Sequence, residues 1–150
     1  ALLQHQARLF APRCEALGLV LQWAECPPLV VPGDPARLRQ VLHNLLDNAL
    51  RYTHAPGVVR ISLARVEPWA RIQIADSAPG VAAELLPRLF ERFFRVEASR
   101  SRHSGGSGLG LAICESLVRA QGGRITAHES ELGGLCVEVL LPLAPTPPLN

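Results

Sequence analysis

The chain has 150 residues, 48% of them apolar, which suits a single domain with one buried core. Its formal net charge of +2 gives no reason to expect a nucleic-acid partner. No apolar run approaches the roughly 18–20 residues of a membrane span, and no signal peptide is visible. The sequence has no methionine, even at position 1, so we expect a soluble, monomeric piece of a longer protein.

The four cysteines, Cys14, Cys26, Cys114 and Cys136, lie far apart in the sequence and form no Cys-x-x-Cys pair. This spacing disfavours both metal ligation and a disulfide framework. We therefore expect free thiols in a reducing cytosol.

The first half of the chain predicts two helices with a strand between them. Residues 2–17 have a helical apolar periodicity that ends at a glycine, and residues 19–23 form a short apolar strand. The second helix has a strong start, because Asp34 can serve as its N-cap and Pro35 can occupy its first position. We expect this helix to run to about Thr53.

The second half predicts two hairpins separated by helices. Residues 58–66 and 70–76 alternate apolar and polar side chains around a turn at Glu67-Pro68. The other expected elements are a short helix at 82–90, an arginine- and serine-rich loop to 106, a helix at 108–120, strands at 124–129 and 135–141 joined through Gly133-Gly134, and a disordered tail at 144–150. This order of elements predicts an α/β (α+β) two-layer sandwich.

A polar stripe is expected on the second helix. Between residues 41 and 52, apolar and polar residues alternate in pairs, and a four-residue step places each set on its own helix face. Asn44 and Asn48 are then one turn apart, with Arg51 and Tyr52 a turn further on. Carboxamide oxygens can ligate magnesium, and a guanidinium can neutralise phosphate oxygens. The alternative is the ordinary solvated face of an amphipathic helix.

A carboxylate at a strand end is a second candidate. The alternating strand Ile72–Asp76 ends in an acid and is followed by Ser-Ala-Pro-Gly. Such a carboxylate can accept a hydrogen bond from the exocyclic amine of adenine, where guanine has a carbonyl. Asp76, Ala78 and Gly80 are the candidate contacts. The alternative is an aspartate that simply begins a turn.

A glycine-rich segment leading into a helix is a third candidate. Glycines let the backbone wrap an anion, and a helix start supplies free N–H groups. A Walker A loop is excluded because the chain contains no lysine, and the spacing does not match a dinucleotide fingerprint after a strand. The candidate phosphate-binding residues are Gly106, Ser107, Gly108, Leu109, Gly110 and Leu111.

These segments together resemble the sequence boxes of the ATP-binding catalytic domain of bacterial sensor histidine kinases. Residues 44–52 (Asn-Leu-Leu-Asp-Asn-Ala-Leu-Arg-Tyr) resemble the N-box, and the other two candidates resemble the G1 box and the G2 box, or ATP lid. Leu-Phe-Glu-Arg-Phe-Phe-Arg, ending at Arg95, resembles the F-box. In that family the residue matching Asn48 is a magnesium ligand and the one matching Asp76 reads the adenine amine. Residues matching Arg51 and Arg95 lie near the phosphates, and Ala78 stands where the family usually has glycine.

This resemblance implies a Bergerat fold, which has a mixed sheet of about five strands with helices on one face. It implies a catalytic domain at 1–143, in which residues 1–10 include a linker from a preceding domain. The implied cofactors are ATP and Mg2+. The segments are most similar to sensors of the BaeS envelope-stress type, which implies a BaeR-like response regulator as partner. The implied parent is a membrane-bound homodimer that holds this domain on the cytoplasmic side of the inner membrane.

Position 44 bears on the type of reaction. Related gyrase- and MutL-type ATPases have a water-activating glutamate there, whereas Asn44 cannot act as a base. None of the five histidines lies in the His-Glu/Asp-x-x-Thr-Pro context of the family's phosphoacceptor, so the chain is not expected to phosphorylate itself. We therefore expect phosphoryl transfer to a histidine on a separate dimerisation domain. The alternatives are an anti-sigma-factor-type serine kinase and a catalytically silent nucleotide-binding domain.

Overall fold

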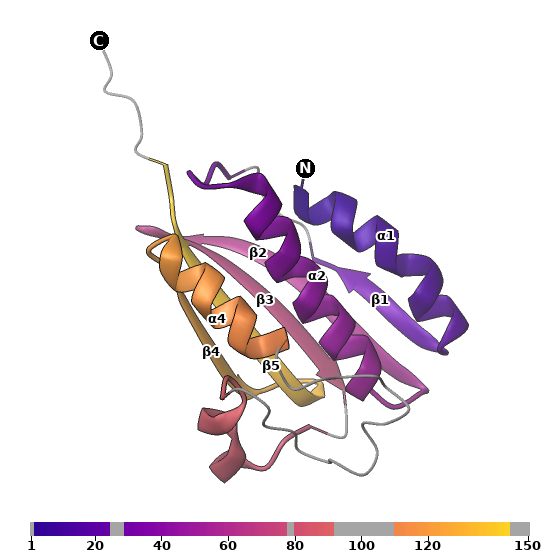
Figure 1. Ribbon diagram of the computed structural model, residues 1–150. Coiled ribbons are helices and arrows are strands. Elements are labelled where there is room, and N and C mark those ends of the chain that lie inside the picture. The colour runs from indigo at the N-terminus through magenta and orange to yellow at the C-terminus, as the bar shows by residue number, and fades with distance from the viewer. Residues whose placement is uncertain (1, 25–28, 78–79, 92–109, 145–150) are drawn as a thin grey trace.

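The computed structural model describes residues 2–24, 29–77, 80–91 and 110–144. Within these residues, five strands form one sheet in the order β1-β2-β3-β5-β4, and α1, α2 and α4 cover one of its faces (Figure 1). The elements are α1 (Leu2–Ala16), β1 (Leu19–Trp23), α2 (Pro35–Tyr52), β2 (Gly57–Val66), β3 (Trp69–Ser77), the 3-10 helix η1 (Ala83–Arg88), α4 (Gly110–Ala120), β4 (Arg124–Glu129) and β5 (Gly133–Pro142). The predicted α/β two-layer sandwich with a mixed five-stranded sheet is confirmed.

Strand direction follows from the connections. β1 pairs parallel with β2 because α2 carries the chain back across the helical layer, whereas β2–β3, β3–β5 and β4–β5 pair antiparallel. Along β3 every second residue is buried, and Ile72 and Ile74 reach the core while Gln73 lies on the opposite face. The alternation read from the sequence therefore places Asp76 on the helix-covered side of the sheet.

Helix α2 packs across the centre of the sheet, as its paired pattern predicts. Its apolar pairs are all buried, namely Val41, Leu42, Leu45, Leu46, Ala49 and Leu50. Asp34 caps the helix by accepting a hydrogen bond from the Ala36 N–H at 2.9 Å, and Pro35 occupies the first position. At the other end, the Thr53 N–H and hydroxyl both bond to the Ala49 carbonyl. The cap and the apolar face together fix where the polar stripe begins and which way it points.

Two expected elements differ in detail from the structure. Gly133-Gly134 does not link the last two strands but begins β5, and the turn is made by residues 130–132. The Gly133 N–H donates to the Ser130 carbonyl, and Gly133 has a φ of +98°, which glycine adopts without strain. The helix expected at 82–90 is a 3-10 helix with Pro87 inside it, because proline removes a donor that an α-helix needs.

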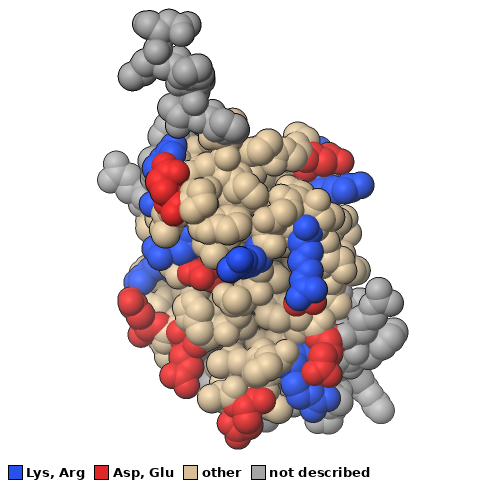
Figure 2. Space-filling view, turned by 90° about the vertical axis from the view of Figure 1, so that its left-hand side faces the viewer, with Lys and Arg blue, Asp and Glu red and all other residues tan. Residues whose placement is uncertain are grey.

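The face of the sheet opposite the helices is polar. The Gln73 carboxamide donates to Glu138 at 2.9 Å, and the guanidinium of Arg124 lies 5.7 Å from the ring centre of Trp69. Figure 2 shows the side of the molecule near α4 and β4, where arginine and acidic side chains are interspersed. Positive charge is thus not gathered into one patch on that side.

Three cysteines are buried with free thiols, namely Cys14, Cys114 and Cys136. Burial raises the pKa of Cys114 to about 12 and that of Cys136 to about 11, and it also raises the pKa of Cys14. These thiols therefore act as core side chains. Among the described residues, no helix has the length and apolar character needed to span a bilayer.

Candidate nucleotide-binding site

Several segments that carry predicted site residues lie at one end of the sheet. Because β3 and β5 are antiparallel, the last residue of β3, Ser77, pairs with the first residue of β5, Gly133. The C-terminal end of α2, the helix η1 and the N-terminal end of α4 lie at this same end, at the bottom of Figure 1. The fold thus brings together segments that are separated by up to about 90 positions in the sequence.

Asp76 is the buried acid of this region. Only 6% of it is exposed, and its Oδ1 accepts a hydrogen bond from the Leu135 N–H of β5 at 2.9 Å. Burial raises the pKa of Asp76 from 3.8 to about 6, although the Leu135 N–H and the Thr53 hydroxyl lower it in part. The Leu135 N–H of β5 therefore holds the carboxylate, whereas the Thr53 hydroxyl donates its proton to the Ala49 carbonyl. A buried acid with few donors is suited to accept a further hydrogen bond.

Two glycines allow close packing of the backbone around this carboxylate. A Cβ on Gly134 would collide with Asp76 Oδ1 and with the Ser77 carbonyl oxygen. Gly80 has a φ of +73°, and a Cβ there would lie 3.1 Å from the Gly134 Cα. The chain therefore passes close to β5 just after Asp76, in a way that needs glycine at both positions. Ala78, the departure from the family pattern, lies outside the described residues.

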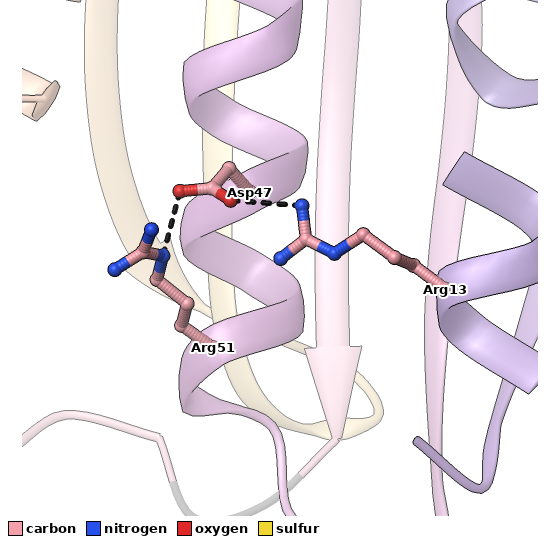
Figure 3. Close-up of polar contacts among 3 residues, drawn as sticks. All are labelled: Arg13, Asp47 and Arg51. Atoms are coloured by element: carbon pink, nitrogen blue, oxygen red, sulfur yellow. Dashed lines mark hydrogen bonds and ion pairs between the residues drawn. The ribbon is translucent and has the colours of Figure 1, made fainter. Parts of the chain in front are cut away.

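The polar stripe of α2 is partly exposed. Asn44, Asn48 and Arg51 are half-buried, and Tyr52 is exposed. The Nε of Arg51 lies 2.7 Å from Asp47 Oδ2 as an ion pair (Figure 3). Its Nε and Nη1 are both buried, and neither has a hydrogen-bond partner within the described part of the chain. An unsatisfied buried guanidinium nitrogen fits a site that receives an anion.

A cysteine of α4 contacts α2 beside this stripe. The Cys114 thiol lies 3.7 Å from the Val41 carbonyl oxygen, and the Asn44 side chain hydrogen-bonds to the same sulfur. Gly110 begins α4 and Leu111 packs against the core, so the start of this helix is anchored beside α2. Of the predicted phosphate-binding segment, these two residues are described.

The remaining predicted contacts, Arg95, Gly106, Ser107, Gly108 and Leu109, lie outside the described residues. Sequence reasoning missed Leu135, which holds Asp76, and Thr53, whose side chain lies beside Asp76. It also missed Asp47, which forms an ion pair with Arg51. The ion pair of Asp47 with Arg51 could have been predicted, because the two residues are four positions apart on a helix. The contact of Leu135 with Asp76 could not, because its donor is a backbone N–H that every residue except proline carries.

Comparison with known proteins identifies the family. The family model of the histidine kinase-, DNA gyrase B- and HSP90-like ATPases matches residues 33–145. The chain belongs to this ATPase family. It is 48% identical over 142 residues to the signal transduction histidine-protein kinase BaeS of Escherichia coli, a match that covers 95% of the chain and 30% of that protein. It is 44% identical to the probable sensor histidine kinase TcrY of Mycobacterium tuberculosis, covering 86% of the chain and 28% of TcrY.

Solved structures of sensor histidine kinases have the same fold as this chain. The mycobacterial sensor histidine kinase MprB matches with a TM-score of 0.83 at 29% identity, covering 97% of this chain and 95% of that one. Full-length ShkA in complex with AMPPNP matches with a TM-score of 0.80 at 34% identity, covering 97% of this chain and 30% of ShkA. Within the ATPase family, the fold is therefore that of sensor histidine kinase catalytic domains. The chain spans about 30% of the length of the curated relatives it matches.

Proposed function

We propose that the chain is the ATP-binding catalytic domain of a two-component sensor histidine kinase. In this proposal it binds Mg-ATP and presents the γ-phosphate to a histidine on a dimerisation domain elsewhere in the full-length protein. The observation that carries the proposal is Asp76, a buried carboxylate at a strand end whose Oδ1 is held by the Leu135 N–H. The kinases BaeS and TcrY support the same assignment through their similarity to this chain.

Adenine recognition is assigned to Asp76. Its Oδ1 is already bonded to Leu135, so an exocyclic amine would find the carboxylate positioned and ready to accept. Guanine has a carbonyl at the same ring position, and two acceptors repel each other. Gly80 and Gly134 let the backbone after Asp76 pack closely against β5, which fixes the position of the carboxylate.

Phosphate and metal binding are assigned to the α2 stripe and the start of α4. Arg51 would neutralise phosphate oxygens, and Asn48 would ligate Mg2+ through its carboxamide oxygen. Groups of three or more His, Cys, Asp or Glu side chains placed to hold a metal do not occur among the described residues. Magnesium would therefore be held largely by ATP oxygens together with Asn48, which is how this cation is usually bound beside phosphates. When bound, it supplies charge neutralisation at the transferring phosphate.

The site lacks a group that would activate water. Asn44 occupies the position of the catalytic base in related ATPases, and its side chain is engaged with Cys114. A carboxamide cannot accept a proton at neutral pH. We therefore infer that the site keeps ATP intact until a histidine nucleophile arrives, and that catalysis relies on positioning and charge neutralisation.

The full-length protein is proposed to be a membrane-bound homodimer. Its catalytic domain would lie on the cytoplasmic side of the inner membrane, and its phosphohistidine would pass the phosphate to a BaeR-like response regulator. The similarity to BaeS over 95% of this chain supports this arrangement.

The decisive experiment mixes this chain with the isolated histidine-bearing domain of the same parent, in the presence of Mg-ATP. The expected product is acid-labile phosphate on that second domain, because phosphohistidine is lost in acid and phosphoserine is not. Acid-stable phosphate on a separate protein would instead favour the serine-kinase alternative. ATP hydrolysis without transfer would contradict the role given to Asn44.

Asn48→Ala is expected to remove the magnesium dependence of ATP-analogue binding, because it deletes the proposed metal ligand. Calorimetric titrations with and without Mg2+ measure this dependence in both proteins. Gln40→Ala is a control on the same helix, because Gln40 is exposed and lies two turns before Asn48. A variant that still binds the analogue more tightly with magnesium would place the metal ligand elsewhere.

A further inference from the structure

One carboxylate on α2 forms ion pairs with two arginines, which come from two different helices. Asp47 Oδ1 lies 2.9 Å from Arg13 Nη1 of α1, and Asp47 Oδ2 lies 2.7 Å from Arg51 Nε of α2. Figure 3 shows the two guanidinium groups approaching Asp47 from opposite sides. The Arg13 contact is also a hydrogen bond between residues 34 positions apart. Asp47 thus joins α1 to the helix that carries the proposed phosphate-binding arginine.

The contact with Asp47 leaves one part of Arg51 free for another partner. Asp47 lies beside Nε as an ion pair, and Nε and Nη1 are both buried without a hydrogen bond to any described residue. A carboxylate in contact with one edge of a guanidinium restricts its rotation and so biases the direction of its other nitrogens. Asp47 therefore restrains Arg51.

This arrangement has an electrostatic cost for a nucleotide. A carboxylate one turn from Arg51 would repel a triphosphate if its charge were not offset. Arg13 supplies the offset, since its guanidinium contacts the other oxygen of Asp47. With Arg13 present, the three side chains carry a net charge of about +1 (two guanidinium groups and one carboxylate). Without it, the charges of Asp47 and Arg51 cancel.

Arg13 is itself held in place by α1 and α2. Its guanidinium lies 5.2 Å from the ring centre of Phe10, a buried core residue one turn earlier. The Phe10 ring in turn packs against the His43 ring of α2, with centroids 5.3 Å apart. The side chain is therefore positioned by packing as well as by Asp47.

We propose that Arg13 is a positioning residue of the phosphate site. It neutralises Asp47, so that Asp47 can orient Arg51 without repelling the triphosphate. This inference rests on the proposed function, because it takes Arg51 as a phosphate ligand. It extends the site to a side chain of α1, a helix that lies wholly before the matched family region.

The test compares Arg13→Gln with the unaltered chain in calorimetric titrations with AMPPNP and with adenosine, at low ionic strength. AMPPNP is expected to bind about two- to fivefold more weakly to the variant, the range for loss of one partly exposed charge contact. Adenosine, which has no phosphate, is expected to bind equally to both proteins. The loss of AMPPNP affinity should shrink at high salt, because exposed charges are screened.

Two further variants separate this role from a structural one. In an Asp47→Asn background, Arg13→Gln is expected to cost little, because Arg13 has then lost the carboxylate that holds its guanidinium near Arg51. Arg8→Gln is the matched control, since Arg8 lies on the same helix but lines a groove of about 270 Å3 with Leu21 and Trp23 of β1. Its AMPPNP affinity should equal that of the unaltered chain.

Three results would overturn the inference while leaving ATP binding intact. These are unchanged AMPPNP affinity in Arg13→Gln, an equal loss for adenosine, and a loss that persists in the Asp47→Asn background. Failure of the unaltered chain to bind either compound would instead overturn the proposed function. The two kinds of failure are therefore distinguishable.

Discussion

Asp76→Asn is expected to weaken ATP binding while making the nucleotide-free domain more stable near neutral pH. Binding should fall by about 1.5–3 kcal/mol, the value of a hydrogen bond to a charged group. Stability should rise because the variant removes a buried charge, and the asparagine Oδ1 can still accept from the Leu135 N–H. The same carboxylate thus favours the nucleotide and opposes folding.

The pH dependence of stability follows from the pKa of Asp76. Burial raises this pKa from 3.8 to about 6, so the folded state binds the proton more tightly than the unfolded chain does. The resulting contribution to stability is fully present below pH 3.8 and is lost as the pH rises through about 6. At pH 7 the charged carboxylate costs the fold up to about 3 kcal/mol, an order-of-magnitude figure. The difference in stability between variant and parent should therefore shrink between pH 7 and pH 4.

Urea unfolding and ATP-analogue calorimetry at pH 5 and pH 7.5 measure both effects. The unaltered chain should bind the analogue more weakly at pH 5, where Asp76 is largely protonated, and Asp76→Asn should lack that part of the pH dependence. Asp34→Asn is the matched control, because Asp34 is exposed and asparagine caps helices as well as aspartate does. An Asp76→Asn protein with lower stability or with normal ATP-analogue affinity would contradict these expectations.

Gly134→Ala is expected to damage both the fold and the site. The new Cβ would collide with Asp76 Oδ1 and with the Ser77 carbonyl oxygen, so β5 must shift away from β3. Overpacking of this kind costs about 1–3 kcal/mol. The shift should also break the hydrogen bond between Leu135 and Asp76, which lowers ATP affinity.

Gly110→Ala is the comparison for this substitution. A Cβ on Gly110 would meet nothing within 4 Å, and alanine is the better helix former. Its stability should be equal to or slightly above that of the unaltered chain. Equal stability of the two variants in urea unfolding would show that the tight packing at Gly134 is not required.

The local elements could be predicted because their signals lie within a few residues. The paired pattern of α2 marks its buried face, and the Asp34-Pro35 start marks its first turn. The hairpin of β2 and β3 follows from alternation around Glu67-Pro68. The positions of Asn48 and Asp76 within these elements were therefore predictable as well.

Contacts between distant segments could not be predicted in this way. Gly133-Gly134 has the composition of a turn, but Gly134 lies in β5 where a side chain would strike Asp76. The raised pKa of Asp76 depends on burial under helices whose docking no short pattern encodes. Arg13 and Asp47 are 34 positions apart, and each alone looks like an ordinary solvated charge.

The burial of Cys14, Cys114 and Cys136 has a consequence for studying the motions of this domain. They are 1%, 0% and 4% exposed, and their raised pKa values keep them in the unreactive thiol form. An alkylating reagent can reach them when the surrounding helices and strands separate, so their rates of modification report local opening. Cys114 contacts α2 beside Asn44, and Cys136 pairs with Ala75 next to Asp76. The sequence thus already contains two reporters, one beside Asn44 and one beside Asp76.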